Sequence, residues 1–422
     1  MADFKELIRK ELIPAMGCTE PIAIAYAAAK AREILGSIPT KITANLSSNI
    51  IKNANSVTVP STNGRKGIEI SVVAGMLLGD ANKELEVLAD IDKSKLDLCD
   101  KFIDEGLVTV NLQANKVGLY IQIILENDSE SSSVTIEGNH TNIVEIKKNE
   151  EILFEKEDDN KEELKVGFSF DQIYNFAKTC DYSDIRDILD RQISYNEKIS
   201  KEGIQNNWGS NIGKIILQNN PNNYYEKLAA YAAAGSDARM NGCELPVVIN
   251  SGSGNQGITT SVPLILYARD YNLSDDSLYR ALIFSNLISL YMKDQIGKLS
   301  AYCGVVSASS AVISSIAFIN DEDKKIIEET ITNALAGNSG IICDGAKSSC
   351  AMKIASSIRN ATLAYQQSKS NNSFGVGDGI VKDSIDKTID TVGKIAKYGM
   401  KKTDEVVLSE MIENYDYLKE FE

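Results

Sequence analysis

The sequence predicts an α+β protein in which a large helical domain is joined by a smaller α/β domain inserted near the N-terminal third. From residue 166 onward, apolar residues recur at helical spacing in segment after segment, several of them rich in small residues. Residues 117–125, in contrast, alternate apolar and polar side chains, as a strand with one buried face does. The expected division is 1–92, a helical segment with active-site loops that packs on the C-terminal domain; 93–165, the α/β domain; and 166–422, the helical domain.

The composition restricts the class of partner and the compartment. The 422 residues carry a net charge of −15, so the chain lacks the basic character that binds nucleic acid or an anionic membrane surface. Seven cysteines in a chain of this length do not make a disulfide scaffold, and the N-terminus lacks the apolar core of a signal peptide. We therefore expect a cytoplasmic protein. The small-residue run at 301–319 is expected to be a packed central helix rather than a membrane span.

The N-terminal region predicts short helices separated by turns. Apolar residues between Phe4 and Leu12 share one helical face that Pro14 ends, and an alanine-rich helix follows as far as Gly36. Cys18 then lies just outside a helix N-terminus, a position that lowers the pKa of a thiol and makes a thiolate available. A buried structural cysteine is the alternative. Further helices are expected at 68–78 and 96–102, and a hairpin at 143–154.

Three cysteines in the C-terminal half form the most informative pattern. Cys343 lies between two glycines on an expected turn, Cys350 falls near the first turns of a helix predicted from residue 346, and Cys303 opens another helical run. Each sulfur would lie near a helix N-terminus, which favours anionic groups. Three thiolates suit an iron–sulfur cubane with one open iron, as in a catalytic site. Three buried cysteines acting as small apolar residues are the alternative.

Short motifs along the chain resemble those of the L-cysteine desulfidase family, which is related to the iron–sulfur L-serine dehydratases. The resemblance covers nearly the whole chain and the motifs occur in the family's order. It implies a [4Fe-4S] cluster on Cys303, Cys343 and Cys350, with Cys18 as the base that takes a proton from the substrate. The segments that carry it are Pro14–Pro21, Gly138–Asn142, Asp237–Met240 and Asn250–Gly257, together with the three cysteines.

The glycine-rich stretch 252–257 matches the G-x-G-x-x-G pattern of dinucleotide-binding proteins. That fold needs a second parallel strand soon after the helix, and the sequence continues with helix instead, so we reject a dinucleotide site. Glycines at a helix start expose N–H groups that suit a carboxylate. Arg239 is expected either to pair with that carboxylate or to be a surface arginine. The residues expected to contact the substrate here are Ser251, Gly252, Ser253, Gly254 and Asn255.

Three further residues are candidates on weaker grounds. His140 is the only histidine and lies on a predicted loop, so it is either a solvated residue or, as the resemblance implies, one that handles a proton or the substrate carboxylate. Asn49 and Asn63 lie in polar, turn-rich stretches that the resemblance brings near the active site, and we expect them to contact substrate. The remaining cysteines at 99, 180 and 243 are expected to be ordinary small residues.

The predicted reaction is iron–sulfur-dependent β-elimination of L-cysteine to pyruvate, ammonia and hydrogen sulfide. An L-serine dehydratase of the same fold is one alternative; those proteins carry a wider gap between the last two cluster cysteines, and some have a C-terminal cysteine that this chain lacks. A non-catalytic iron–sulfur redox or sensor protein is another. We expect an amino-acid substrate, no nucleic-acid or membrane partner, and leave a homodimer open.

Overall fold

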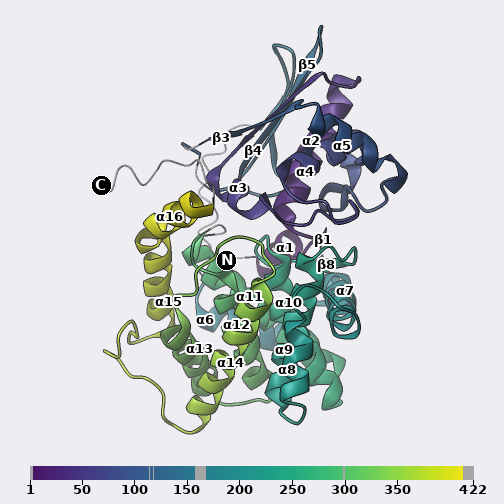
Figure 1. Ribbon diagram of the computed structural model, residues 1–422. Helices are drawn as coiled ribbons and strands as arrows, with labels where there is room; N and C mark the ends of the chain where they lie inside the picture. The colour runs from purple at the N-terminus through teal and green to yellow at the C-terminus, as the bar shows by residue number, and fades with distance from the viewer. Residues whose placement is uncertain (1–2, 114, 117, 157–167, 298–299, 412–422) are drawn as a thin grey trace.

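The computed structural model describes residues 3–113, 115–116, 118–156, 168–297 and 300–411. These residues form two stacked parts, a sheet covered by helices and a larger helical body (Figure 1). The predicted α+β class is therefore confirmed.

Six strands within the described residues form a mixed sheet in the order β3-β2-β4-β5-β6-β7. β2 and β3 run parallel, and the other neighbouring pairs are antiparallel. β4 shows the predicted alternation, because Ile121, Ile123 and Leu125 are buried while the residues between them are partly exposed. The strands are β2 (Lys41–Leu46), β3 (Val108–Leu112), β4 (Tyr120–Glu126), β5 (Ser131–Glu137), β6 (Ile143–Lys148) and β7 (Glu151–Glu155).

Two of the helices in this part pack very closely. α2 lies against β4 and β5, and α4 packs on α2. A Cβ atom on Gly75 would lie 2.2 Å from the carbonyl oxygen of Ala25, so the close approach of α2 and α4 requires glycine. Gly36, with φ +78°, ends α2 as predicted. The helices are α2 (Thr19–Leu35), α3 (Ser48–Ala54), α4 (Ile68–Leu78) and α5 (Leu96–Asp104), with 3₁₀ turns at Ala81–Glu86 and Lys93–Lys95.

Part of this sheet differs from the prediction. Residues 1–92 were expected to form a helical segment that packs on the C-terminal domain, whereas β2 lies inside the sheet, between β3 and β4. Strands from both 1–92 and 93–165 therefore share one sheet. The polar stretch that begins at Ser47 was expected to be a loop, yet Ser48 begins α3. The domain boundaries themselves stay a prediction.

The helical body is built around α12 (Gly304–Ile319), which packs against α10, α11, α13 and α14. Its serines are buried, as expected of a packed central helix. None of the helices in the described ranges is long and apolar enough to cross a membrane. The other elements here are α6 (Phe170–Thr179), α7 (Arg186–Gln205), α8 (Ile212–Asn219), α9 (Tyr224–Met240), α10 (Gly254–Asp270), α11 (Asp275–Ile296), α13 (Lys324–Asn338), α14 (Cys350–Lys369), α15 (Ile385–Lys394), α16 (Lys401–Met411), a 3₁₀ turn at Ser183–Ile185 and a π-turn at Ile395–Gly399.

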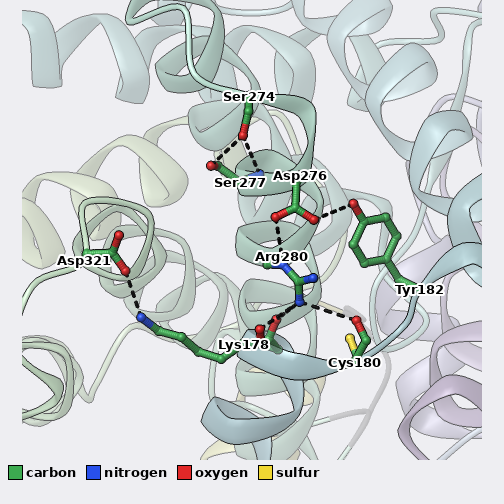
Figure 2. Close-up of polar contacts among 9 residues, drawn as sticks. Lys178, Cys180, Tyr182, Ser274, Asp276, Ser277, Arg280 and Asp321 are labelled. Carbon is green, nitrogen blue, oxygen red and sulfur yellow. Dashed lines mark hydrogen bonds and ion pairs between the residues drawn. The ribbon is translucent and has the colours of Figure 1, made fainter.

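Arg280 on α11 secures the end of α6 (Figure 2). Its Nη1 atom donates to the carbonyl oxygens of Lys178 at 2.9 Å and Cys180 at 3.4 Å, groups that a helix C-terminus leaves without intrahelical partners. Its Nε atom donates to Asp276 at 2.9 Å, and Asp276 also accepts from the hydroxyl of Tyr182. Arg280 thereby ties the end of α6 to α11 through backbone carbonyl groups.

The N-terminal segment joins the two parts. α1 (Phe4–Glu11) is followed by β1 (Pro14–Met16), which pairs antiparallel with β8 (Pro246–Val248) of the helical body. α2 begins at Thr19, three residues after β1, and α10 begins at Gly254, shortly after β8. The starts of α2 and α10 are consequently placed side by side, and Cys18 and Ser253 line the same cavity.

Candidate active site

One cavity lies where the starts of several helices meet, and most of the predicted site residues line it. Its volume of about 90 Å³ is several times the roughly 10–15 Å³ that one water requires. The walls come from α2, α3, α9, α10 and α12 and from the loop before α14. The predicted residues in its lining are Cys18, Asn49, Arg239, Ser253, Asn255, Cys303, Cys343 and Cys350.

Backbone pairing brings the cysteine segments together. The N–H of Cys303 donates to Ile341 at 3.0 Å, and the N–H of Cys343 donates to Ala301 at 2.7 Å. These bonds fix the position before α12 against the loop before α14. Cys303 is the N-cap of α12 and Cys350 is the first residue of α14, as predicted.

Cys343, however, lies in the loop and not at a helix N-terminus. The helix predicted from residue 346 begins at Cys350 instead, and residues 346–349 form the end of the loop, which turns at Gly345 with φ +91°.

Cys303 and Cys343 share a proton unequally. Contact with the Cys303 thiol lowers the pKa of Cys343 to about 6 despite its burial, and the charges of Lys52 and Lys293 lower it further. The pKa of Cys303 moves in the opposite direction through the same contact and through burial. Within this pair, Cys343 is therefore the thiol that ionises more readily.

The donor set fits an iron–sulfur cluster. All three cysteines are free thiols and all three line the cavity. Among the described residues, no group of three His, Cys, Asp or Glu closes around a single metal ion. A cluster that binds each thiolate to a different iron does not need such a group. The buried cations Lys52 and Arg239 in the same wall suit the anionic charge of thiolate ligands.

Cys18 lies at the start of α2, and its thiol donates a hydrogen bond to a carboxylate. It is the N-cap residue and 1% exposed, and its Sγ atom donates to Oε2 of Glu20 at 3.0 Å. Burial raises the pKa of the Cys18 thiol well above its ordinary value, and the Glu20 carboxylate raises it further. The predicted lowering of this pKa is therefore wrong, because burial beside a carboxylate outweighs the helix N-terminus.

Glu20 connects several parts of the cavity wall. Besides the Cys18 thiol, it accepts hydrogen bonds from Thr19 at 3.1 Å and from Asn53 of α3 at 2.9 Å. Burial by itself would raise the pKa of Glu20, but contact with His140 and Cys18 lowers it to about 2. Glu20 is thus a buried carboxylate that stays ionised.

His140 is buried, so the alternative of a solvated loop histidine is wrong. The ring is behind the cavity wall, with Nε2 at 3.7 Å from Oε1 of Glu20. A Cβ atom on Gly252 would lie 3.0 Å from the ring, so the glycine-rich turn packs directly on it. Neither ring nitrogen has a hydrogen-bond partner among the described residues. His140 therefore contacts Glu20 of the cavity wall and does not line the cavity itself.

Arg239 points into the site and is 3% exposed, so the alternative of a surface arginine is wrong. Its Nη1 atom donates to Oδ1 of Asn255 at 3.2 Å, while its Nε atom has no hydrogen-bond partner in the described part of the chain. A Cβ atom on Gly254 would lie 2.2 Å from Nε. Gly254 is therefore the residue that lets the guanidinium lie against the start of α10.

The glycine-rich stretch is a turn into α10 and not a dinucleotide loop. β8 pairs antiparallel with β1, so the parallel sheet that a dinucleotide fold requires does not follow. Ser251 and Gly252, with φ +49° and +75°, form the turn behind the cavity, and Ser253 caps α10 by accepting from the N–H of Gln256. Ser253, Asn255 and Gln256 are the members of the stretch that reach the cavity, whereas the predicted contacts Ser251, Gly252 and Gly254 are not in its lining.

A family comparison agrees with this geometry. A model described as "Serine dehydratase alpha chain" matches residues 82–409, which include Arg239 and the three cysteines of the cavity. The chain belongs to the serine dehydratase alpha chain family. Membership indicates a lyase of the dehydratase type with an iron–sulfur group.

Several relatives of this family member are similar over almost their full length, and each is named UPF0597 protein. One from Finegoldia magna is 46% identical over 421 residues, covering 98% of this chain and 100% of the relative. One from Lachnoclostridium phytofermentans is 46% identical, covering 96% and 98%. One from Desulfitobacterium hafniense is 43% identical, covering 97% and 96%.

The two asparagines predicted for this serine dehydratase family member lie in different places. Asn49 is on α3 and lines the cavity, where its Nδ2 atom donates to Asp404 at 2.8 Å. Asn63 is exposed on a turn with φ +55° and is outside the cavity lining. The structure therefore brings Asn49 to the site and not Asn63.

Sequence reasoning missed Glu20 and Lys52. An acid in the first turn of a helix is an ordinary preference, so Glu20 gave no separate signal. Lys52 lies in α3, where every residue except Ser48 is buried, and it is itself 2% exposed. The neighbouring Asn49 and Asn53 make this stretch polar, and lysine is almost never fully buried without a partner, so no signal in the sequence indicated its burial.

Proposed function

We propose that this protein catalyses iron–sulfur-dependent β-elimination on L-cysteine, giving pyruvate, ammonia and hydrogen sulfide. The observation that supports this most directly is the single cavity that three cysteines share with Cys18 and the buried Arg239. If the three cysteines were only small packing residues, the packing would not require a buried guanidinium, or a thiol that is hydrogen-bonded to a carboxylate, in the same cavity. The family favours dehydratase-type chemistry in general, and L-serine is the alternative substrate because the family name refers to it.

Arg239 is the proposed binding group for the substrate carboxylate. Its guanidinium is buried and only partly satisfied by Asn255, so a carboxylate would supply the hydrogen-bond acceptors that Nε lacks. The charge of Glu20 favours the ionised guanidinium, as its effect on the Arg239 pKa indicates, and a bound carboxylate would pair with it directly. This makes an α-amino acid a better fit than an uncharged thiol or alcohol.

Cys18 is the proposed acceptor of the substrate's α-proton, and Glu20 orients it by accepting the hydrogen bond of its thiol at 3.0 Å. The thiol must first give up its own proton, which the Glu20 carboxylate opposes and the charge of Arg239 favours, because each shifts the Cys18 pKa in that direction. His140 lies on the far side of Glu20, where its contact helps to keep that carboxylate ionised. The resulting thiolate faces the cavity beside Arg239.

The three cysteines would hold the cluster. When it is bound, a cluster with one open iron supplies a Lewis acid that draws electrons from the β-substituent as this leaves. Cys303 and Cys350 are buried and Cys343 is half-buried, which limits the access of water to the leaving group.

Product analysis tests this proposal. Protein reconstituted anaerobically with iron and sulfide, then freed of excess reagents, should release sulfide and pyruvate in equal amounts from L-cysteine. Pyruvate from L-serine at a higher kcat/KM than from L-cysteine would replace the desulfidase with the dehydratase. Iron-loaded protein that converts neither substrate would support the non-catalytic cluster protein instead.

A further inference from the structure

Lys52 is a buried cation of the cavity wall, and its ammonium group has two hydrogen-bond acceptors. It is 2% exposed, and its Nζ atom donates to the carbonyl oxygen of Cys343 at 3.3 Å. It also forms an ion pair with the carboxylate of Asp404. A buried ammonium needs a counter-charge to stay ionised in place, so Asp404 is what keeps Lys52 beside the Cys343 carbonyl.

The counter-charge comes from the last described helix. Asp404 is on α16, which follows the π-turn at Ile395–Gly399 and packs mainly on that turn and on α3. Figure 1 shows α16 in yellow beside α3. Besides Lys52, Asp404 accepts a hydrogen bond from Asn49 of α3 at 2.8 Å. The carboxylate of Asp404 therefore connects α16 to two cavity-lining residues of α3, Asn49 and Lys52.

α3 in turn supports the loop that carries Cys343. The Lys52–Cys343 hydrogen bond is one contact between them. Gly345 is another, since a Cβ atom there would lie 2.6 Å from the Lys52 carbonyl oxygen. The Nζ atom of Lys347 donates to the carbonyl of Asn55 at 2.5 Å. The loop from 343 to 350 thus rests on α3 over much of its length.

We propose that Lys52 is a positioning residue for the Cys343 loop, and that Asp404 of α16 is the latch that holds Lys52 in place. The C-terminal helix then determines how firmly the loop keeps its shape. The effect on cluster retention rests on the proposed function, in which Cys343 is a cluster ligand. The effect on the stability of the loop does not depend on the proposed function.

Hydrogen–deuterium exchange on the cluster-free protein tests the latch directly. The amide of Cys343 is protected by its bond to Ala301, so its exchange reports opening of the loop. Asp404→Asn keeps the shape of the side chain and an acceptor for Asn49 but removes the charge that Lys52 needs. We expect exchange in peptides spanning 342–350 to become at least about tenfold faster, which corresponds to about 1.4 kcal/mol.

A matched control and a second variant make the result specific. Glu410→Gln removes the same charge from an exposed position on the same helix, and exchange at 342–350 should not change. Lys52→Met should accelerate exchange as Asp404→Asn does, and the double variant should add little, because the two residues act through one contact. Unchanged exchange in Asp404→Asn, or fully additive effects, would overturn the latch.

Iron retention separates this inference from the proposed function. In anaerobically reconstituted protein, a ferrous-iron chelator should remove iron faster from Asp404→Asn than from wild type or Glu410→Gln. If the wild type binds no iron while the exchange result holds, the proposed function fails and the latch stands. If wild type and Asp404→Asn lose iron at the same rate, the latch does not govern cluster retention and that part of the proposal is wrong.

Discussion

Substituting Gly254 by alanine should separate substrate binding from cluster binding. The residue is the first of α10 and its backbone is not in the left-handed region, so alanine is compatible with the local conformation. The new Cβ atom, however, would lie 2.2 Å from Nε and 2.6 Å from Cζ of Arg239. The guanidinium would have to move by about 1 Å to restore an ordinary contact of roughly 3.5 Å.

A displacement of that size has a predictable cost. A misplacement of about 1 Å in a positioning group lowers turnover by roughly 100-fold, which corresponds to about 2.7 kcal/mol. Because Arg239 is the proposed carboxylate ligand, we expect kcat/KM for L-cysteine to fall by roughly 100-fold and KM to rise. The cysteines lie on other elements, so iron content should match that of the wild type.

The assay is steady-state sulfide release by anaerobically reconstituted protein, with iron determined on the same samples. Gly375→Ala is the matched control, since the added Cβ would meet nothing closer than 3.8 Å and activity should be unchanged. Circular dichroism checks the fold. Wild-type kinetics in a correctly folded, iron-loaded Gly254→Ala protein would refute the assignment of Arg239 to the carboxylate.

Three further predictions concern the thiols. Each of the variants Cys303→Ala, Cys343→Ala and Cys350→Ala should lose the charge-transfer absorption and most of the roughly four irons of a cubane. A stable, complete cluster in Cys343→Ala would exclude Cys343 as a ligand. Cys18→Ser should keep iron and fold but lower turnover by about two or more orders of magnitude, the scale of general-base catalysis, and near-normal sulfide release would place the base elsewhere. Glu20→Gln removes a charge that raises the Cys18 pKa, so the rise of kcat/KM with pH, which follows the thiolate, should move to lower pH; a profile that stays in place or moves to higher pH would contradict the Cys18–Glu20 pairing.

The elements that were predicted correctly depend on nearby residues. α4 begins and ends at Ile68 and Leu78 as its apolar run indicates, and α2 stops at a glycine. The cysteine set was recognisable because its chemistry is specific and its motif resembles that of a known family. Cys303, Cys343 and Cys350 do line one cavity.

The features that were missed depend on distant partners. β2 has an ordinary short apolar pattern, and it becomes a strand because it lies between β3 and β4. The role of Lys52 requires Asp404, which is 352 positions away in the chain. The Cys18 pKa was misjudged because a local rule about helix ends was applied without the burial and the Glu20 carboxylate that the fold supplies.

The pairing of β1 with β8 has a consequence for the order of events during synthesis. Pro14–Met16 must wait for Pro246–Val248 to leave the ribosome before it has a partner, and Cys18 follows β1 directly. The cavity wall is completed only when Cys350 has been made, and domains fold as their residues emerge from the N-terminus. Until the second half of the chain has been made, Cys18 therefore lacks the contacts with Met240 and Cys350 that help to bury it. In the proposed function, the three cluster cysteines are complete only in the nearly finished polypeptide, and a chain truncated before α14 would carry Cys18 and Glu20 without Cys350.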